Sequence, residues 1–183
     1  MSRLLIPLLI AVLPAGAQFS APRAAAAIAV DQRLMSTDLI RALERHFDGN
    51  MAATARSKEP LDVVGSPRGL YLPGYGVVLT AEVDLIVVPG APALFNRPPT
   101  PEEKAQIHAR KVEQLRVLEK IMRDTVTSLA QSLDIMPETD RVAMAVRLLY
   151  RPWEDTNNLP TQILMTADRK SAMAGQIKEE TSK

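Results

Sequence analysis

Two pairs of carboxylates are the strongest candidates for chemistry in this 183-residue chain. Glu82 and Asp84 stand two positions apart in a stretch of alternating residues, so they share one face of a strand at about 7 Å. Glu154 and Asp155 stand together in a later polar segment. Paired carboxylates act as acid and base in glycoside hydrolysis, but charged residues on an edge strand or open sheet face also keep a protein soluble. A hydrolase that uses these four dispersed carboxylates is therefore the alternative function.

The two histidines, His46 and His108, provide no local metal site. Both lie in stretches with helical periodicity, where a metal-binding histidine has a second ligand three or four residues away. Neither has a carboxylate or another histidine at those positions. Residues 154–158 (Glu-Asp-Thr-Asn-Asn) offer oxygen ligands, but they lack the alternating acidic spacing of a calcium-binding loop. We therefore predict no metal and no cofactor.

No residue stands in a recognisable nucleophile motif. Residues 65–69 (Gly-Ser-Pro-Arg-Gly) have the wrong spacing for a Gly-x-Ser-x-Gly elbow and are typical of a turn before a strand. The chain has no cysteine, which excludes disulfides, thiolate nucleophiles, iron–sulfur clusters and a lipid attached to cysteine. Its eight glycines form no phosphate-binding loop. We predict no catalytic residue, and an enzyme is the less favoured class.

Charge and aromatic content argue against nucleic acid as a partner. The 22 lysine and arginine residues against 21 aspartate and glutamate residues give a formal net charge of +1. A near-neutral chain has no bulk field that attracts nucleic acid or an anionic membrane. Aromatic residues make up only 4% of the chain, too few for a platform that stacks bases.

The first seventeen residues have the pattern of a secretory signal peptide. Arg3 precedes an uncharged apolar run that ends at residues 15–17 (Ala-Gly-Ala), the small-x-small pattern of a cleavage site. The run is too short for a membrane span, and two prolines interrupt it. We predict export to the periplasm or the extracellular space, a mature chain that begins at Gln18, and no transmembrane span after cleavage. Residues 27–29 (Ala-Ile-Ala) are a second, less favoured cleavage site.

The mature chain is expected to hold one α+β domain over residues 31–168. Residues 18–30 are small and Ala-rich and indicate a flexible lead-in. Between residues 31 and 56, apolar side chains recur every four positions, which predicts a helix. Residues 169–183 are a polar C-terminal tail, which we expect to fray apart from a short helix around Met173.

A second, long helix is predicted to begin at Pro101 and to end before Pro137. Thr100 and Glu103 have the spacing of a capping box, and apolar residues follow at intervals of three and four. The members of this stripe are Leu115, Leu118, Met122, Val126, Leu129 and Leu133. Solvent-side ion pairs are expected at Glu113–Arg116, Glu119–Arg123 and Lys120–Asp124.

A β-hairpin is predicted between the two helices. Residues 77–88 alternate, with one face apolar and the other mixed, as in a half-buried strand. Residues 69–72 form the partner strand, which could begin as early as Leu61. The join at residues 72–75 (Leu-Pro-Gly-Tyr) has proline and glycine at the second and third positions of a type II turn.

Alternation returns after the long helix, at residues 142–150 and 163–167. The sequence therefore predicts a sheet of at least four strands, in the order helix, hairpin, long helix, two strands, with the helices packed on one face. Strand, helix and strand in succession form a crossover, so strands 77–88 and 141–150 are expected to run parallel in one sheet. This arrangement places the loops 89–101 and 151–160 at the same end of the sheet.

The favoured function is that of a non-enzymatic exported protein that binds a partner in the cell envelope or outside it. This interpretation depends on the lack of a catalytic constellation and on the long loops. Trp153, the single tryptophan, lies in one of these loops, where such a residue is either a lid over the edge of the core or an anchor for a partner. Trp153, Glu154 and Asp155 form the candidate partner-binding site, and Tyr75 is expected at the opposite end of the sheet.

Overall fold

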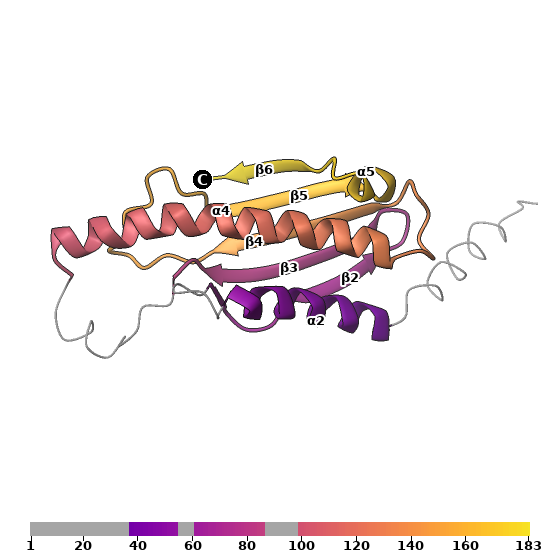
Figure 1. The fold of residues 1–183 in the computed structure, drawn as a ribbon, viewed down its shortest axis with the longest axis horizontal. Helices are drawn as coiled ribbons and strands as arrows, with labels where there is room; N and C mark the ends of the chain where they lie inside the picture. Colours follow the sequence, from indigo (N-terminus) through magenta and orange to yellow (C-terminus); the bar gives the residue numbers. More distant parts are fainter. Residues whose placement is uncertain (1–36, 55–60, 87–98) are drawn as a thin grey trace, which may run out of the picture.

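The computed structural model describes residues 37–54, 61–86 and 99–183. Within these ranges three helices accompany a six-stranded mixed sheet, which confirms the predicted α+β class (Figure 1). The elements are α2 (Thr37–Thr54), β1 (Asp62–Val63), β2 (Arg68–Leu72), β3 (Gly76–Asp84), α4 (Pro101–Ser132), β4 (Arg141–Leu148), β5 (Gln162–Asp168), α5 (Arg169–Met173) and β6 (Lys178–Ser182). The predicted leader, the Ala-rich lead-in and most of the proline-rich loop lie outside the described residues.

The predicted β-hairpin is formed by β2 and β3. The Tyr75 amide donates a hydrogen bond to Leu72 O at 3.0 Å, and Gly74 has a φ of 76°, as a type II turn requires. The strand ends at Asp84 instead of Val88. The earlier start that the sequence suggested is a separate short strand, β1, which pairs with the other end of β3.

The sheet has the order β1-β3-β4-β5-β6, and β2 lies beside β1 on the same edge of β3. Strands β3 and β4 run parallel, from the pair Gly76↔Arg141 to the pair Val83↔Leu148, and all other pairs are antiparallel. The predicted parallel pair is therefore confirmed, and α4 is its crossover. The hairpin turn lies at the start of β4, where the Arg141 amide donates to Tyr75 O at 2.7 Å.

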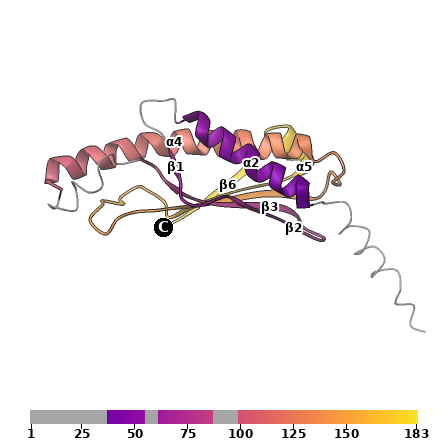
Figure 2. The ribbon, with the colours of Figure 1, turned by 90° about the horizontal axis from the view of Figure 1, so that it is seen from below.

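All three helices lie on one side of the sheet (Figure 2). The strands present one row of buried side chains to them, as in β3, where Val77, Leu79 and Val83 are fully buried. From α4, five of the six predicted stripe residues are buried and Leu115 is partly buried. The core lies between these helices and the inner face of the sheet, as the sequence pattern predicted.

Both ends of α4 are capped. At its start, Glu103 N–H donates to Thr100 Oγ1 at 3.2 Å and Thr100 N–H donates to a Glu103 carboxylate oxygen at 2.8 Å, which is the predicted capping box. Near its end, Arg169 donates through Nε to Ala130 O at 2.9 Å and through Nη1 to Met136 O at 3.1 Å. A cation at the carbonyl end of a helix also balances its dipole. None of the helices in residues 37–54, 61–86 and 99–183 is long and apolar enough to cross a membrane.

The prediction that the chain frays beyond Arg169 is wrong. The expected short helix forms as α5, but the chain then returns as β6 and pairs antiparallel with β5 from Thr166↔Lys178 to Gln162↔Ser182. Backbone pairing holds this strand, since its side chains are exposed along its whole length. Arg123 also departs from expectation, because its guanidinium binds Glu179 of β6 at 2.8 Å instead of Glu119 on its own helix.

Candidate functional site

A lysine on the inner face of α4 is the centre of the candidate site. Lys111 is 1% exposed and is one of two buried polar or charged residues in the described part of the chain. It lies four residues before Leu115 and seven before Leu118, so it occupies the position where the apolar stripe would continue toward the start of the helix. The helix therefore directs this ammonium toward the end of β3 and the loop that follows β4.

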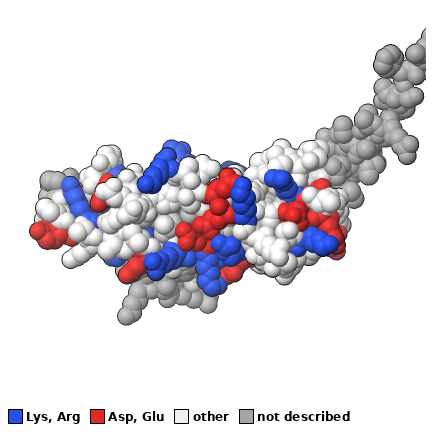
Figure 3. Space-filling model, turned by 90° about the horizontal axis from the view of Figure 1, so that it is seen from above, with Lys and Arg blue, Asp and Glu red and all other residues white. Residues whose placement is uncertain are grey.

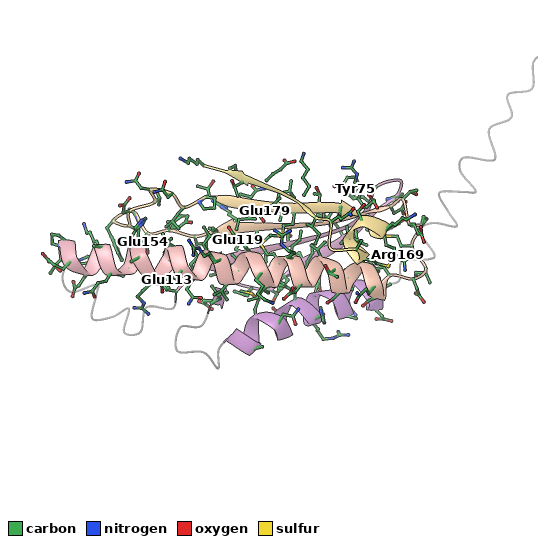
Figure 4. The ribbon with its side chains drawn as sticks, turned by 45° about the horizontal axis from the view of Figure 1, so that its top comes forward. Tyr75, Glu113, Glu119, Glu154, Arg169 and Glu179 are labelled. Carbon is green, nitrogen blue, oxygen red and sulfur yellow. The ribbon has the colours of Figure 1, made fainter. Side chains whose placement is uncertain are left out.

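Two carboxylates and a second cation surround Lys111. Its Nζ lies 2.6 Å from Glu154 Oε2 and 3.0 Å from Asp84 Oδ1. The other oxygens of the same carboxylates face Arg151, at 3.2 Å for Glu154 and 3.6 Å for Asp84. The four side chains thus form a closed ring in which cations and carboxylates alternate. We call Asp84, Lys111, Arg151 and Glu154 the ionic ring; Figure 4 labels Glu154 beside the first half of α4.

The ionic ring is balanced in charge and hydrogen bonding. Lys111 Nζ also donates to Leu149 O at 3.3 Å, so its three N–H groups have three acceptors. The Tyr150 ring centroid lies 5.0 Å from the same ammonium. Burial of a charge is costly, and pairing offsets that cost only when the buried charge has partners. Lys111 and Glu154, whose side chains are 1% exposed, each have two partners within the ring, whereas Asp84 and Arg151 are 15% and 35% exposed and keep part of their contact with water.

Tyr150 joins the two ends of the loop that follows β4. Its hydroxyl donates to Pro160 O at 2.7 Å, so the residues at the two ends of the loop are joined. Burial, followed by the charges of Glu154 and Asp84, raises the pKa of this phenol well above its ordinary value of 10. The phenol therefore remains protonated and keeps its donor role throughout the physiological pH range.

The segment 149–161, which we call the ring loop, has further attachments. His108 of α4 donates through Nδ1 to Asp155 O at 3.0 Å. Two turns shape the segment, with Glu154 N donating to Arg151 O and Leu159 N donating to Thr156 O, each at 3.0 Å. Ring, histidine and turns together fix a segment that has no helix or strand of its own.

Only part of the ring loop is buried. The Glu154 side chain, Leu159 and Pro160 face the interior, whereas Trp153 is partly exposed. The exposed members are Pro152, Asp155, Thr156, Asn157 and Asn158. The surface of the loop therefore offers one large aromatic ring beside backbone and side-chain hydrogen-bonding groups, a composition that suits binding.

The structure brings together two of the four carboxylates that the sequence indicated. Asp84 and Glu154 meet on Lys111, although 70 residues of chain separate them. Glu82 is directed elsewhere and pairs with Arg147 at 3.3 Å on the uncovered face of the sheet. Asp155 is exposed and accepts from the Asn157 amide within its own turn. The pair that does meet is engaged on both sides by the cations of Lys111 and Arg151.

The cations of the site were missed by the sequence analysis. Lys111 and Arg151, and Tyr150 beside them, were not singled out, because residue type alone does not distinguish a buried lysine from a solvated one. One signal was present, namely that Lys111 falls on the apolar stripe of its helix. Among the described residues, no three histidine, aspartate or glutamate side chains form a group that could hold a metal ion.

Tyr75 lies at the opposite end of the sheet from the ring loop, as predicted. It borders the start of β4, where its ring centroid is 5.8 Å from the guanidinium carbon of Arg141, and Figure 4 shows it far from Glu154. Comparison of the chain with models of protein families, with curated proteins and with solved structures finds no match.

Proposed function

We propose that this chain is an exported, non-enzymatic protein that captures a protein partner in the cell envelope or outside it. The ring loop is the proposed binding segment, and Trp153 is its anchor. The observation that carries the proposal is that a partly buried ionic ring holds an irregular loop in place while the tryptophan of that loop stays partly exposed. A loop that is ordered before binding loses little conformational entropy when a partner arrives.

The surface chemistry supports a protein as the partner. Protein interfaces are enriched in tryptophan at their centre and in hydrogen-bonding groups at their rim. Trp153 is of the residue type found at the centre of interfaces, and residues 155–158 (Asp-Thr-Asn-Asn), which follow it in the loop, are exposed and polar. A complementary partner presents an apolar pocket edged by amide and hydroxyl groups.

Site-specific crosslinking in the native host tests the binding segment. A photoreactive amino acid at Thr156 should crosslink to the partner, whereas the same amino acid at Val117, which is 40% exposed on α4, should not. Trp153→Ala should reduce the crosslinked yield by about tenfold or more, since loss of a tryptophan anchor commonly weakens an interface by 2 kcal/mol or more. Val117→Ala is the matched control. Equal yields from positions 156 and 117 would count against the ring loop as the site.

Export is supported by the leader pattern of residues 1–17 and is tested separately. The N-terminus of the protein released by its host should be Gln18. A mature chain that still begins at Met1 would contradict export by a cleaved leader. This result would leave the crosslinking test of the ring loop unaffected.

A further inference from the structure

We infer that the outer edge of β6 is a docking site for an extended, basic segment of a protein partner, which adds to the sheet as a further strand. In the described part of the chain, β6 is the last strand of the sheet and pairs on one side only, with β5. Addition of an extended segment to an open sheet edge is a recurrent mode of protein recognition. The inference rests on the proposed function, because it assigns a chemistry to the partner that the ring loop captures.

The register of β5 determines which backbone groups of β6 face outward. Leu148 N donates to Thr161 O, so the alternation of an antiparallel ladder directs the odd-numbered residues of β5 toward β4 and the even-numbered residues toward β6. The β6 partners of these even-numbered residues bond to β5, namely Lys178, Glu180 and Ser182. The N–H and C=O groups of Glu179 and Thr181 therefore face away from the sheet, where no residue of the described ranges bonds to them.

Both faces of β6 are open as well as its edge. All five residues of the strand are exposed, although the Glu179 carboxylate binds Arg123 of α4 at 2.8 Å. Unpaired backbone groups at an exposed edge are a template for another strand. An added strand would gain main-chain hydrogen bonds there without displacing any part of the described fold.

Charge on the α4 side of β6 favours a basic segment. Burial first, and then the charge of Glu179, raises the pKa of the Glu119 carboxyl on α4 above its ordinary value of 4.5. Arg123 and Arg116 act in the opposite sense, but the effect of Glu179 exceeds that of either arginine taken singly. Figure 4 labels Glu119 and Glu179 on neighbouring elements, and Figure 3 shows acidic side chains near the middle of this side of the molecule. A cation placed between these two carboxylates would stabilise both.

The geometry of an added strand would supply such a cation. Because Glu179 presents its backbone to the edge, the residue paired with it would have its side chain on the same face, with the two β-carbons about 4.5–5.5 Å apart. That face is the one toward α4, since the Glu179 side chain binds Arg123. Every second residue of the segment has this orientation. The segment that fits therefore has lysine or arginine at alternate positions.

The other face of β6 limits what can pair with it. Lys178 and Glu180 form an ion pair of their own there. Charged side chains on an edge strand oppose the addition of apolar strands, which would leave these charges without water or a partner. The edge therefore selects a segment that is polar on this face.

Strand β6 also leads to the ring loop. Ser182 O accepts hydrogen bonds from Thr161 N at 2.8 Å and from Thr161 Oγ1 at 3.2 Å. Thr161 is the last residue of the ring loop, so a segment that follows β6 to its end reaches that loop. One partner can therefore contact both surfaces.

A peptide and a proline substitution test the edge. The probe is a synthetic peptide of alternating threonine and lysine, added to the full chain. It should bind and should slow hydrogen exchange at the amides of Glu179 and Thr181, since strand addition bonds them. Thr181→Pro removes an outward N–H and keeps the bonds to β5, so it should raise the dissociation constant by about tenfold or more. Thr181→Val, which retains the amide, is the matched control and should bind as the wild type does.

Two further peptides separate backbone pairing from charge without altering the protein. The same peptide N-methylated at alternate residues cannot form the edge bonds and should not bind. A peptide with glutamate in place of lysine should not bind either. In the protein, Glu119→Gln should weaken binding of the lysine peptide, whereas Glu113→Gln, nearer the start of the same helix, should not.

Several results would overturn the inference. Among them are no binding of the lysine peptide, equal affinity of Thr181→Pro and the wild type, and equal binding of the glutamate peptide. A protein that sediments alone as a dimer, which Thr181→Pro dissociates, would show that the edge binds a second copy instead. Trp153→Ala should bind the peptide as tightly as the wild type, so a failed crosslink at Thr156 with intact peptide binding would count against the ring loop and not against the edge.

Discussion

Lys111 Nζ lies 2.6 Å from Glu154 Oε2, and both side chains are 1% exposed. The contact joins the first half of α4 to a loop 43 residues farther along the chain. A buried ion pair gives little net stability, because desolvation offsets the attraction. Its effect here is positional, since this pair and its neighbours determine where the ring loop lies.

Loss of Lys111 should destabilise the fold strongly. Lys111→Met keeps the length of the side chain but leaves the buried carboxylate of Glu154 and the partly buried one of Asp84 with Arg151 alone, a change expected to cost about 3–5 kcal/mol. Lys120→Met is the matched control, since Lys120 pairs with Asp124 at the surface and its loss should cost about 0–1 kcal/mol. Denaturant unfolding measures both values. Equal losses in the two variants would show that Lys111 is not buried.

The same substitution should loosen the ring loop. Without the ammonium, Glu154 loses its closest partner, and the middle of the segment is held to the body of the domain by His108 and by the Arg151–Asp84 pair, while backbone bonds from Leu149 to Val83 and from Thr161 to Ser182 still fix its two ends. Amides of residues 149–161 should exchange with solvent about tenfold faster or more, while those of β4 change less. Trp153, the single tryptophan, should report the change as a red-shifted fluorescence emission. An unchanged exchange pattern would mean that the turns suffice to order the loop.

Much of the fold followed from local pattern and topology. Residues 72–75 (Leu-Pro-Gly-Tyr) defined the turn, Thr100 and Glu103 defined the start of α4, and the strand–helix–strand order gave the parallel pair. Strand β6 was missed for a physical reason. Its sequence, Lys-Glu-Glu-Thr-Ser, has no apolar alternation, because neither of its faces is buried. Backbone hydrogen bonds to β5 form the strand, and a sequence carries no direct sign of them.

The site was harder to predict from the sequence than the fold. Asp84 and Glu154 were both candidates, but their meeting depends on the parallel register that aligns the end of β3 with that of β4. The cation that joins them, Lys111, has the same residue type as a solvated surface lysine. Burial distinguishes the two, and burial is a property of the assembled helix and sheet.

The residues of the apolar stripe should account for most of the stability that α4 contributes to the fold. Met122 and Leu129 are 0% and 1% exposed, so Met122→Ala and Leu129→Ala should each cost about 2–5 kcal/mol, partly through the cavity left behind. Val117→Ala, on the outer side of the same helix, should change the free energy of unfolding by about 0.5 kcal/mol or less. Chemical unfolding of the three variants tests the assignment of faces. Comparable effects at Val117 and Met122 would contradict it.

Gly76 should not tolerate any side chain. Its φ is 130°, and a β-carbon there would lie 1.9 Å from Arg141 O in the adjacent strand. Gly76→Ala must separate β3 from β4 at their first pair, and we expect a loss of about 3 kcal/mol or more. Gly49, in the middle of α2, is the opposite case, since a β-carbon there meets nothing within 4 Å. Gly49→Ala should stabilise the protein by about 0.5–1 kcal/mol through helix propensity. Similar effects of the two substitutions would exclude the close approach at Gly76.

Asp168 should make the free energy of unfolding depend on pH in the acidic range. It caps α5, where its carboxylate accepts hydrogen bonds from the Ser171 amide and from Ser171 Oγ, both at 2.8 Å. These bonds, that of the amide first, hold the pKa of Asp168 below its ordinary value of 3.8. A carboxyl group with a lowered pKa in the folded state contributes stability that is complete above pH 3.8 and is lost as the pH falls through the folded-state pKa.

The expected signature is a difference in acid slope between variants. The wild type should lose stability below about pH 4 partly through Asp168, so Asp168→Asn, which cannot titrate and still caps a helix, should lose less over the same range. Ser171→Ala removes the hydroxyl donor and keeps the amide donor, so its slope should fall between the other two. Urea midpoints measured from pH 6 to pH 3 give the three slopes. If the wild type and Asp168→Asn respond identically to acid, then the cap of α5 does not stabilise the ionised carboxylate, and α5 must depend on the burial of Ala172.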